Sequence, residues 1–146
     1  MEMYDDVRTA IQDFSGFQRR WSKVKNGFEE FFGNFNPDAL QIPGISIVLD
    51  VAIGTCTIEA FSRKFEASLS PLLANDKSLV GNVEFVELVK EKRILIERFF
   101  ITHQQSVMTL AGETLMPVAD FSEQQTRHIL NLLLQGLSRP INSTDD

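Results

Sequence analysis

The chain of 146 residues has the size of a single domain, and its 43% hydrophobic and 23% charged residues are typical of a globular protein rather than a disordered one. The formal net charge of −6 argues against direct readout of duplex DNA, because nucleic-acid affinity comes mainly from Lys and Arg side chains that neutralise phosphates. A single cysteine, an acidic N-terminus and no long apolar run predict a cytoplasmic protein without a membrane segment.

Residues 2–32 show the spacing of a long amphipathic helix. Apolar side chains recur every three or four positions from Tyr4 to Phe31, with charged residues between them. Trp21 continues this apolar stripe, so we expect it to point into the core. Four basic residues around it are candidate binding residues for an anionic ligand, although a solvated helix face is the simpler interpretation: Arg19, Arg20, Lys23 and Lys25.

The middle of the chain predicts an antiparallel sheet. Residues 45–53 alternate in the manner of a strand with one buried face. Residues 55–73 fit both strand alternation and helical spacing, and their Thr-rich start favours a strand with a change of register near Ala60. Further strands are expected at residues 83–89, 93–102, 106–111 and 114–118. These segments predict a meander of about five strands.

The last segment predicts a second helix. Ser122 with Gln125, or Asp120 with Glu123, has the spacing of a capping box, and a run rich in leucine follows. The fold class is therefore α+β: an antiparallel meander of about five strands with a long N-terminal helix and a C-terminal helix packed on it.

We expect one domain over residues 1–140 and a polar, disordered tail over residues 141–146. The layout and the acidic charge resemble those of small dimeric secretion chaperones. The architecture of those chaperones places a helix among the strands, so the resemblance favours the helical alternative for residues 58–73.

Candidate catalytic groups are few. Cys56 with His103 or His128 could form a thiol–imidazole pair, but Cys56 lies in a Thr-rich strand without an activating environment, so a buried structural cysteine is expected. These residues lack metal-ligand spacing, and neither a metal nor another cofactor is expected. Several carboxylates alternate with basic residues, which indicates ion pairs on a solvated sheet face rather than acid–base catalysis: Glu84, Glu87, Glu91 and Glu97.

These patterns predict an interaction protein rather than an enzyme. The first hypothesis is a non-enzymatic acidic protein that binds a protein partner, as a chaperone, immunity protein or inhibitor does. The second is a protein that sequesters a small molecule in a pocket between subunits, and the third is an enzyme with scattered carboxylates. Excess apolar surface predicts a homodimer with these interface residues: Phe99, Phe100, Leu130, Leu133 and Leu134.

Overall fold

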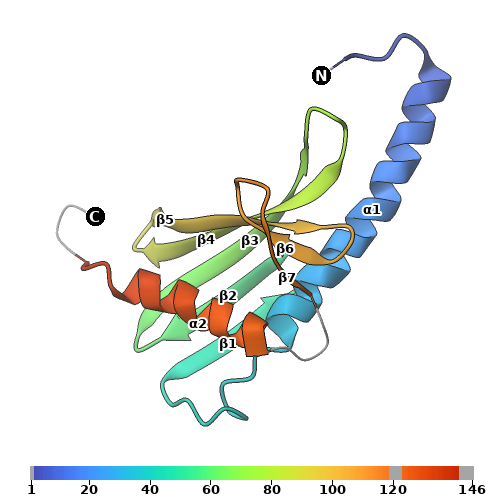
Figure 1. The fold of residues 1–146 in the computed structure, drawn as a ribbon. Coiled ribbons are helices and arrows are strands. Elements are labelled where there is room, and N and C mark those ends of the chain that lie inside the picture. The colour runs from blue at the N-terminus through green and yellow to red at the C-terminus, as the bar shows by residue number, and fades with distance from the viewer. Residues whose placement is uncertain (1, 119–122, 142–146) are drawn as a thin grey trace.

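Two helices and seven strands make up the fold in the computed structural model, which describes residues 2–118 and 123–141 (Figure 1). The elements in chain order are α1 (Val7–Gly33), β1 (Ile45–Asp50), β2 (Thr55–Ala60), β3 (Arg63–Leu73), β4 (Leu79–Val89), β5 (Lys92–Thr102), β6 (Ser106–Met108), β7 (Thr114–Pro117) and α2 (Glu123–Leu137). The predicted α+β class is confirmed, whereas the predicted number of about five strands is too low. No helix in the described ranges is long and apolar enough to cross a membrane.

Helix α1 begins later than the apolar spacing indicated. Asp6 is its N-cap, and the Asp6 carboxylate accepts a hydrogen bond of 2.8 Å from the backbone N–H of Thr9. This bond satisfies one of the N–H groups that a helix start leaves without a partner. Residues 2–6 therefore precede the helix rather than forming its first turn.

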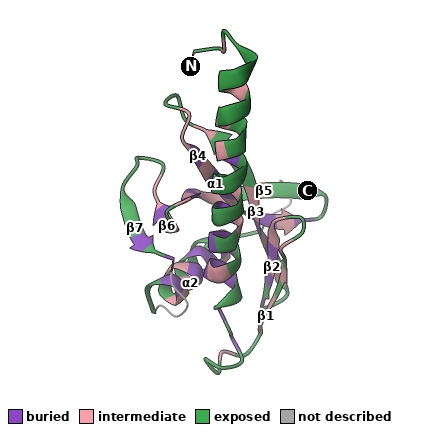
Figure 2. Cartoon of the chain, turned by 90° about the vertical axis from the view of Figure 1, so that its right-hand side faces the viewer, coloured by how far each residue is buried: buried purple, intermediate pink, exposed green. Residues whose placement is uncertain are grey.

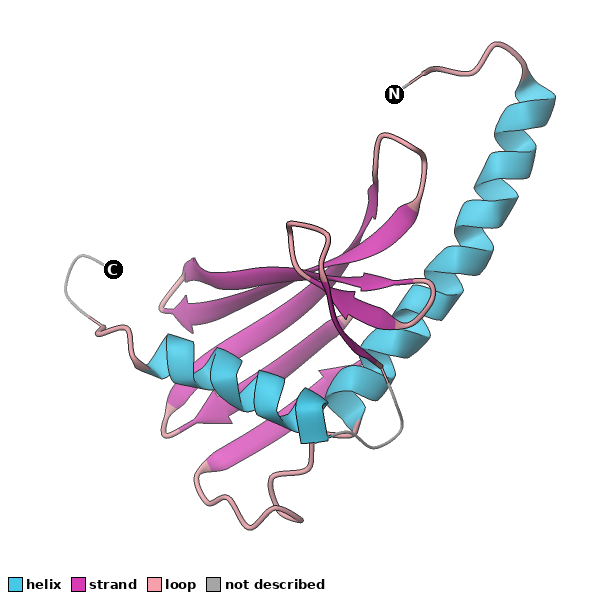
Figure 3. Ribbon diagram, viewed as in Figure 1, coloured by secondary structure: helices cyan, strands magenta, loops and turns pink. Residues whose placement is uncertain are grey.

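The sheet is a continuous antiparallel meander in which each strand pairs with the next along the chain (Figure 3). Residues 55–73 form two of its strands, joined by Phe61 and Ser62 with φ angles of 51° and 69°. Two successive positive φ angles characterise the tight turn whose twist suits a two-residue hairpin. The helical alternative for this segment is wrong, and within the described residues 45–117 no helix lies between the strands, unlike in the chaperone layout.

Both helices pack on one face of the sheet, which we call the inner face (Figures 1 and 3). Phe31 of α1 and His128 of α2 each contact the ring of Phe99 on β5. The strands contribute these fully buried side chains to the same core: Cys56, Ile58, Phe65, Ala67, Val83, Phe85, Phe99 and Ile101.

Two glycines let the helices approach the sheet closely. A Cβ atom on Gly81 of β4 would lie 2.4 Å from Cγ1 of Val24 in α1. A Cβ atom on Gly136 of α2 would lie 2.4 Å from Cε1 of Phe65 in β3. Both distances are shorter than van der Waals contact, so a side chain at either position would force the neighbouring side chains to shift.

Several predicted features lie partly or wholly outside the described residues. The cap residues Asp120 and Ser122 are among them, while their partners Glu123 and Gln125 lie at the start of α2. Of the expected tail, only Ile141 is described.

Candidate protein-interaction surface

The two halves of α1 lie in different environments (Figure 2). The second half packs into the core, and Phe28, Phe31 and Phe32 are at most 1% exposed. The first half extends past the sheet and carries large apolar side chains that are mostly in contact with solvent: Val7 at 73%, Ile11 at 61% and Phe14 at 62% exposure. We call these three residues the α1 stripe. Contiguous exposed apolar side chains of this kind mark interaction sites on protein surfaces.

The loop between β3 and β4 holds the projecting half of α1 from one side. Nζ of Lys77 lies 3.6 Å from Oδ2 of Asp13 and 4.1 Å from the ring centroid of Tyr4. The Tyr4 ring in turn lies 6.4 Å from the ring of Phe14. These contacts position the start of α1 beside the β3–β4 hairpin and leave the α1 stripe exposed.

A shallow groove continues the stripe toward the core. Phe14, Phe17, Gln18 and Trp21 of α1 line one wall, and Pro71 and Leu79 of the hairpin line the other. Trp21 is partly buried and packs against the core, which confirms the expected inward orientation. The apolar surface therefore runs from Val7 to the groove.

The four predicted anion-binding residues, Arg19, Arg20, Lys23 and Lys25, do not form a single site. Burial and the positive charges of Arg20 and Lys23 lower the pKa of His103, which lies in the turn after β5. The structure thus adds His103 to two of the predicted residues, and Lys25 is partly buried farther along α1. The proximity of His103 was not apparent from the sequence, because His103 lies 80 positions after Lys23 in the chain.

The predicted interface residues lie at different depths. Phe99 and Leu133 are 1% and 2% exposed and belong to the core of the chain itself. Phe100 and Leu130 are partly buried. Leu134 points away from the core with 63% exposure. Leu134 is therefore the most exposed of the five, and Phe99 and Leu133 are the two that the core of the chain itself covers.

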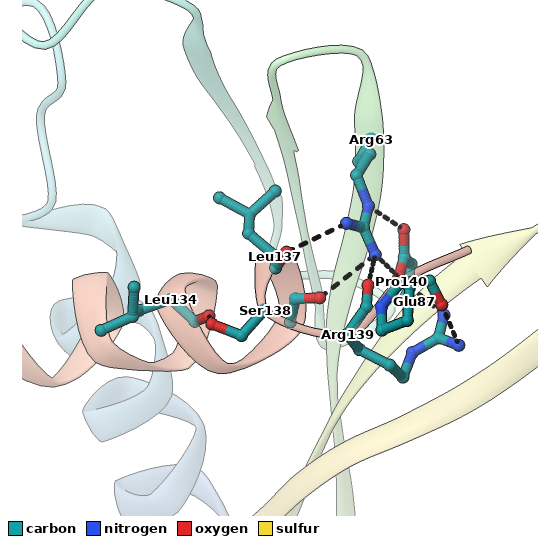
Figure 4. Close-up of polar contacts among 8 residues, drawn as sticks. Arg63, Glu87, Leu134, Leu137, Ser138, Arg139 and Pro140 are labelled. Carbon is teal, nitrogen blue, oxygen red and sulfur yellow. Dashed lines mark hydrogen bonds and ion pairs between the residues drawn. The ribbon is translucent and has the colours of Figure 1, made fainter.

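Glu87 forms a buried ionic cluster with two arginines (Figure 4). Its side chain is 1% exposed, and its oxygens accept bonds of 2.7 and 2.6 Å from Nε and Nη2 of Arg63 and of 2.8 Å from Nη2 of Arg139. Arg63 also donates to the backbone oxygens of Gly136, Leu137 and Arg139. A cation that binds the last carbonyls of a helix caps it favourably, so the cluster fastens the end of α2 to the sheet.

This arrangement corrects the expectation that Glu87 lies on a solvated face. Burial alone would raise the pKa of Glu87, but the hydrogen bonds and charges of Arg63 and Arg139 outweigh it and lower the pKa. Glu97 lies on the inner face, where burial raises its pKa, while Glu84 is on the opposite face and Glu91 is exposed. The four carboxylates do not converge on a common site.

Cys56 is completely buried, as expected, and burial raises the pKa of its thiol to about 12. A nucleophilic cysteine needs the opposite shift. His128 packs between the rings of Phe31 and Phe99, at centroid distances of 5.8 and 5.2 Å. Within the described ranges, no three His, Cys, Asp or Glu side chains gather into a metal-binding group.

Comparisons of the chain with protein-family models, with curated proteins and with solved structures found no match.

Proposed function

We propose that this protein is a non-enzymatic, acidic interaction protein that binds a protein chain through the α1 stripe. The observation that carries the proposal is the exposure of Val7, Ile11 and Phe14 on a helix that extends beyond its own sheet. Complete burial of one such side chain is worth about 1.5–3 kcal/mol, so a partner that covers the stripe gains several kcal/mol. Apolar residues at this spacing are typical of helix-mediated recognition.

The acidic charge, the single buried cysteine and the expected cytoplasmic location are consistent with this role. Affinity capture from the native lysate tests it, with Ile11→Glu compared against Gln12→Glu. Both positions are exposed and adjacent, and both variants add one negative charge, but only Ile11 belongs to the stripe. We expect Ile11→Glu to lose protein partners that the wild type and Gln12→Glu retain. Equal capture by all three would contradict the proposal.

The second hypothesis, a small ligand, is favoured by the group of Arg20, Lys23 and His103. Two positively charged side chains near a histidine favour a bound anion, which would also raise the lowered pKa of His103. An NMR titration of the His103 ring with inorganic phosphate tests this candidate. A pKa of His103 that rises with phosphate in the wild type, and much less in Lys23→Gln, would support it, whereas an unchanged pKa would exclude a phosphate site.

A further inference from the structure

β1 forms one edge of the sheet, and among the described strands it pairs only with β2 (Figure 1). The ladder between them continues to Gly44 and Phe61, where the carbonyl oxygen of Gly44 accepts a hydrogen bond of 2.9 Å from the backbone N–H of Phe61. Because bonded and non-bonded pairs alternate along an antiparallel ladder, the even-numbered residues of β1 bond to β2. The odd-numbered residues point their N–H and C=O groups away from the sheet, and no described residue bonds to them: Ile45, Ile47 and Leu49.

This edge lacks the features that usually protect a free edge strand, such as a bulge, a proline or a lysine. β1 pairs with β2 without a shift of register, and its one charged residue is Asp50 at its end. The part of β5 that lies beyond its pairing with β6 contains a register shift and begins with Lys92 and Arg93. At the opposite edge of the sheet, β7 has four residues and ends in Pro117. β1 is therefore the edge most able to accept another strand.

A trough runs along the free edge of β1. Gly33 and residues 35–38 of the connector between α1 and β1 face residues 45–47 across a cavity of about 260 Å³. Leu49, Gln105 and the end of α1 line a second cavity of about 440 Å³, which Gly33 also lines. We call these two cavities the β1 trough. The connector forms a wall opposite β1, so the trough admits a single extended segment, whereas a second sheet would need the space that the wall occupies.

The charges in the β1 trough are negative. Asp38 lines the first cavity, and Glu29 and Glu30 line the second. No Lys or Arg among the described residues lines either cavity, and none of the three carboxylates has an ion-pair partner in that part of the chain. Carboxylates that are not neutralised favour a partner of positive charge. The trough therefore complements a basic segment.

We propose that the β1 trough binds an extended peptide that carries Lys or Arg side chains and adds to the sheet as a strand beside β1. In strand addition, backbone hydrogen bonds supply affinity and side-chain contacts supply specificity. The outward N–H and C=O groups of Ile45, Ile47 and Leu49 supply the hydrogen bonds here, and the three carboxylates select basic side chains. This inference goes beyond the proposed function, because the trough shares no residue with the α1 stripe.

Hydrogen exchange tests the backbone contacts. In the free protein, the amides of Ile45, Ile47 and Leu49 should exchange faster than those of Ser46 and Val48, which bond to β2. A phage-display library of random decapeptides is then selected against the full chain, and the most enriched sequence is synthesised. We expect this peptide to contain Lys or Arg, to bind at micromolar concentrations and to slow the exchange of the three outward amides.

Substitution of the carboxylates tests the charge complementarity. Glu29→Gln combined with Glu30→Gln should weaken binding of the selected peptide severalfold at low salt and should reduce the dependence of the affinity on salt. The matched control is Glu91→Gln combined with Glu113→Gln, which makes the same change of charge at exposed residues outside the trough. The control should bind the peptide as the wild type does.

Ile47→Pro removes one outward N–H, whereas Ile47→Val keeps it. Proline is tolerated on an edge strand where the N–H faces solvent, so we expect a folded Ile47→Pro protein, checked by circular dichroism, that has lost most of its affinity, and an Ile47→Val protein that retains it. If Ile47→Pro does not fold, the exchange measurement and the glutamate variants still decide. A selection that enriches no basic sequence would overturn the inference, as would a selected peptide that leaves the three outward amides unprotected or that binds the Glu29/Glu30 variant as tightly as its control.

Discussion

Removal of the Glu87 carboxylate should be among the most costly single changes in this protein. The side chain is 1% exposed, and it accepts three hydrogen bonds of 2.6–2.8 Å from two guanidinium groups. Breaking a buried ion pair by removal of one partner costs about 3–5 kcal/mol. The side chains of Arg63 and Arg139 are 19% and 25% exposed, so water can partly solvate their charges once the carboxylate is gone. We therefore expect Glu87→Ala to lower the free energy of unfolding by about 3 kcal/mol.

Urea unfolding followed by the fluorescence of Trp21, the one tryptophan, measures this loss. Glu84→Ala is the matched control, because Glu84 lies on the same strand but on the opposite face and is partly exposed. We expect the control to change the free energy of unfolding by about 0.5 kcal/mol or less. Arg139→Ala should fall between the two, because Arg63 still neutralises Glu87 in that variant.

The effect of Glu87 should also depend on pH. Because the folded state lowers the pKa of Glu87 below its ordinary value of 4.5, the ion cluster stabilises the fold above that value and loses its contribution as the pH falls through the lowered pKa. The difference between wild type and Glu87→Ala should therefore shrink below pH 4.5. A cost of less than about 1 kcal/mol at pH 7, or a difference that grows on acidification, would refute the clamping role of this cluster.

Three further predictions follow from packing and burial. Gly136→Ala should lower the free energy of unfolding by about 1–3 kcal/mol, because the added methyl group would clash with Phe65. Gly16→Ala is the control: its Cβ atom would lie 3.8 Å from the nearest neighbouring atom, so this variant should be neutral or more stable by up to about 1 kcal/mol. Thermal melts compare the two variants. Cys56 should resist a mild alkylating agent at pH 7 in the native state and react once urea unfolds the chain, and rapid native labelling would contradict the pKa of about 12. Because burial lowers the pKa of His128 below its ordinary 6.5, protonation of His128 should lower the stability of the fold as the pH falls below 6.5. His128→Phe should flatten this part of the curve of stability against pH. An unchanged slope would contradict the lowered pKa of His128.

The class of fold could be predicted from the sequence because the helices and most strands have strong periodicities. The predicted count of about five strands is lower than the seven observed, and one of the missing strands has a specific reason. The turn between β2 and β3 consists of Phe61 and Ser62, although Gly, Asn and Asp are the residues usually found at positive φ angles. The alternation of polar and apolar residues nearly continues through this turn, so two strands of a hairpin looked like one strand with a change of register.

The ionic cluster could have been predicted only in part. Alternation along β4 places Glu87 on the same face as Val83, Phe85 and Val89, and this pattern was a signal that the carboxylate is buried. Its partners could not be identified in that way, because Arg63 and Arg139 lie 24 and 52 positions away in the chain. Such pairings depend on how α2 docks, and local patterns carry no information about that docking.

The exposed stripe raises the question of what keeps the start of α1 helical. A helical segment that lacks tertiary packing is only marginally stable in water, because helix nucleation is costly and each further residue adds little. The first turns of α1 have the cap formed by Asp6 and the contacts of Lys77 with Asp13 and Tyr4, while Val7 and Ile11 remain exposed. A second helix laid along the stripe would supply the missing apolar packing and would stabilise this segment by the free energy of binding. The surface that we propose for partner binding is thus also the part of α1 with the least apolar packing of its own.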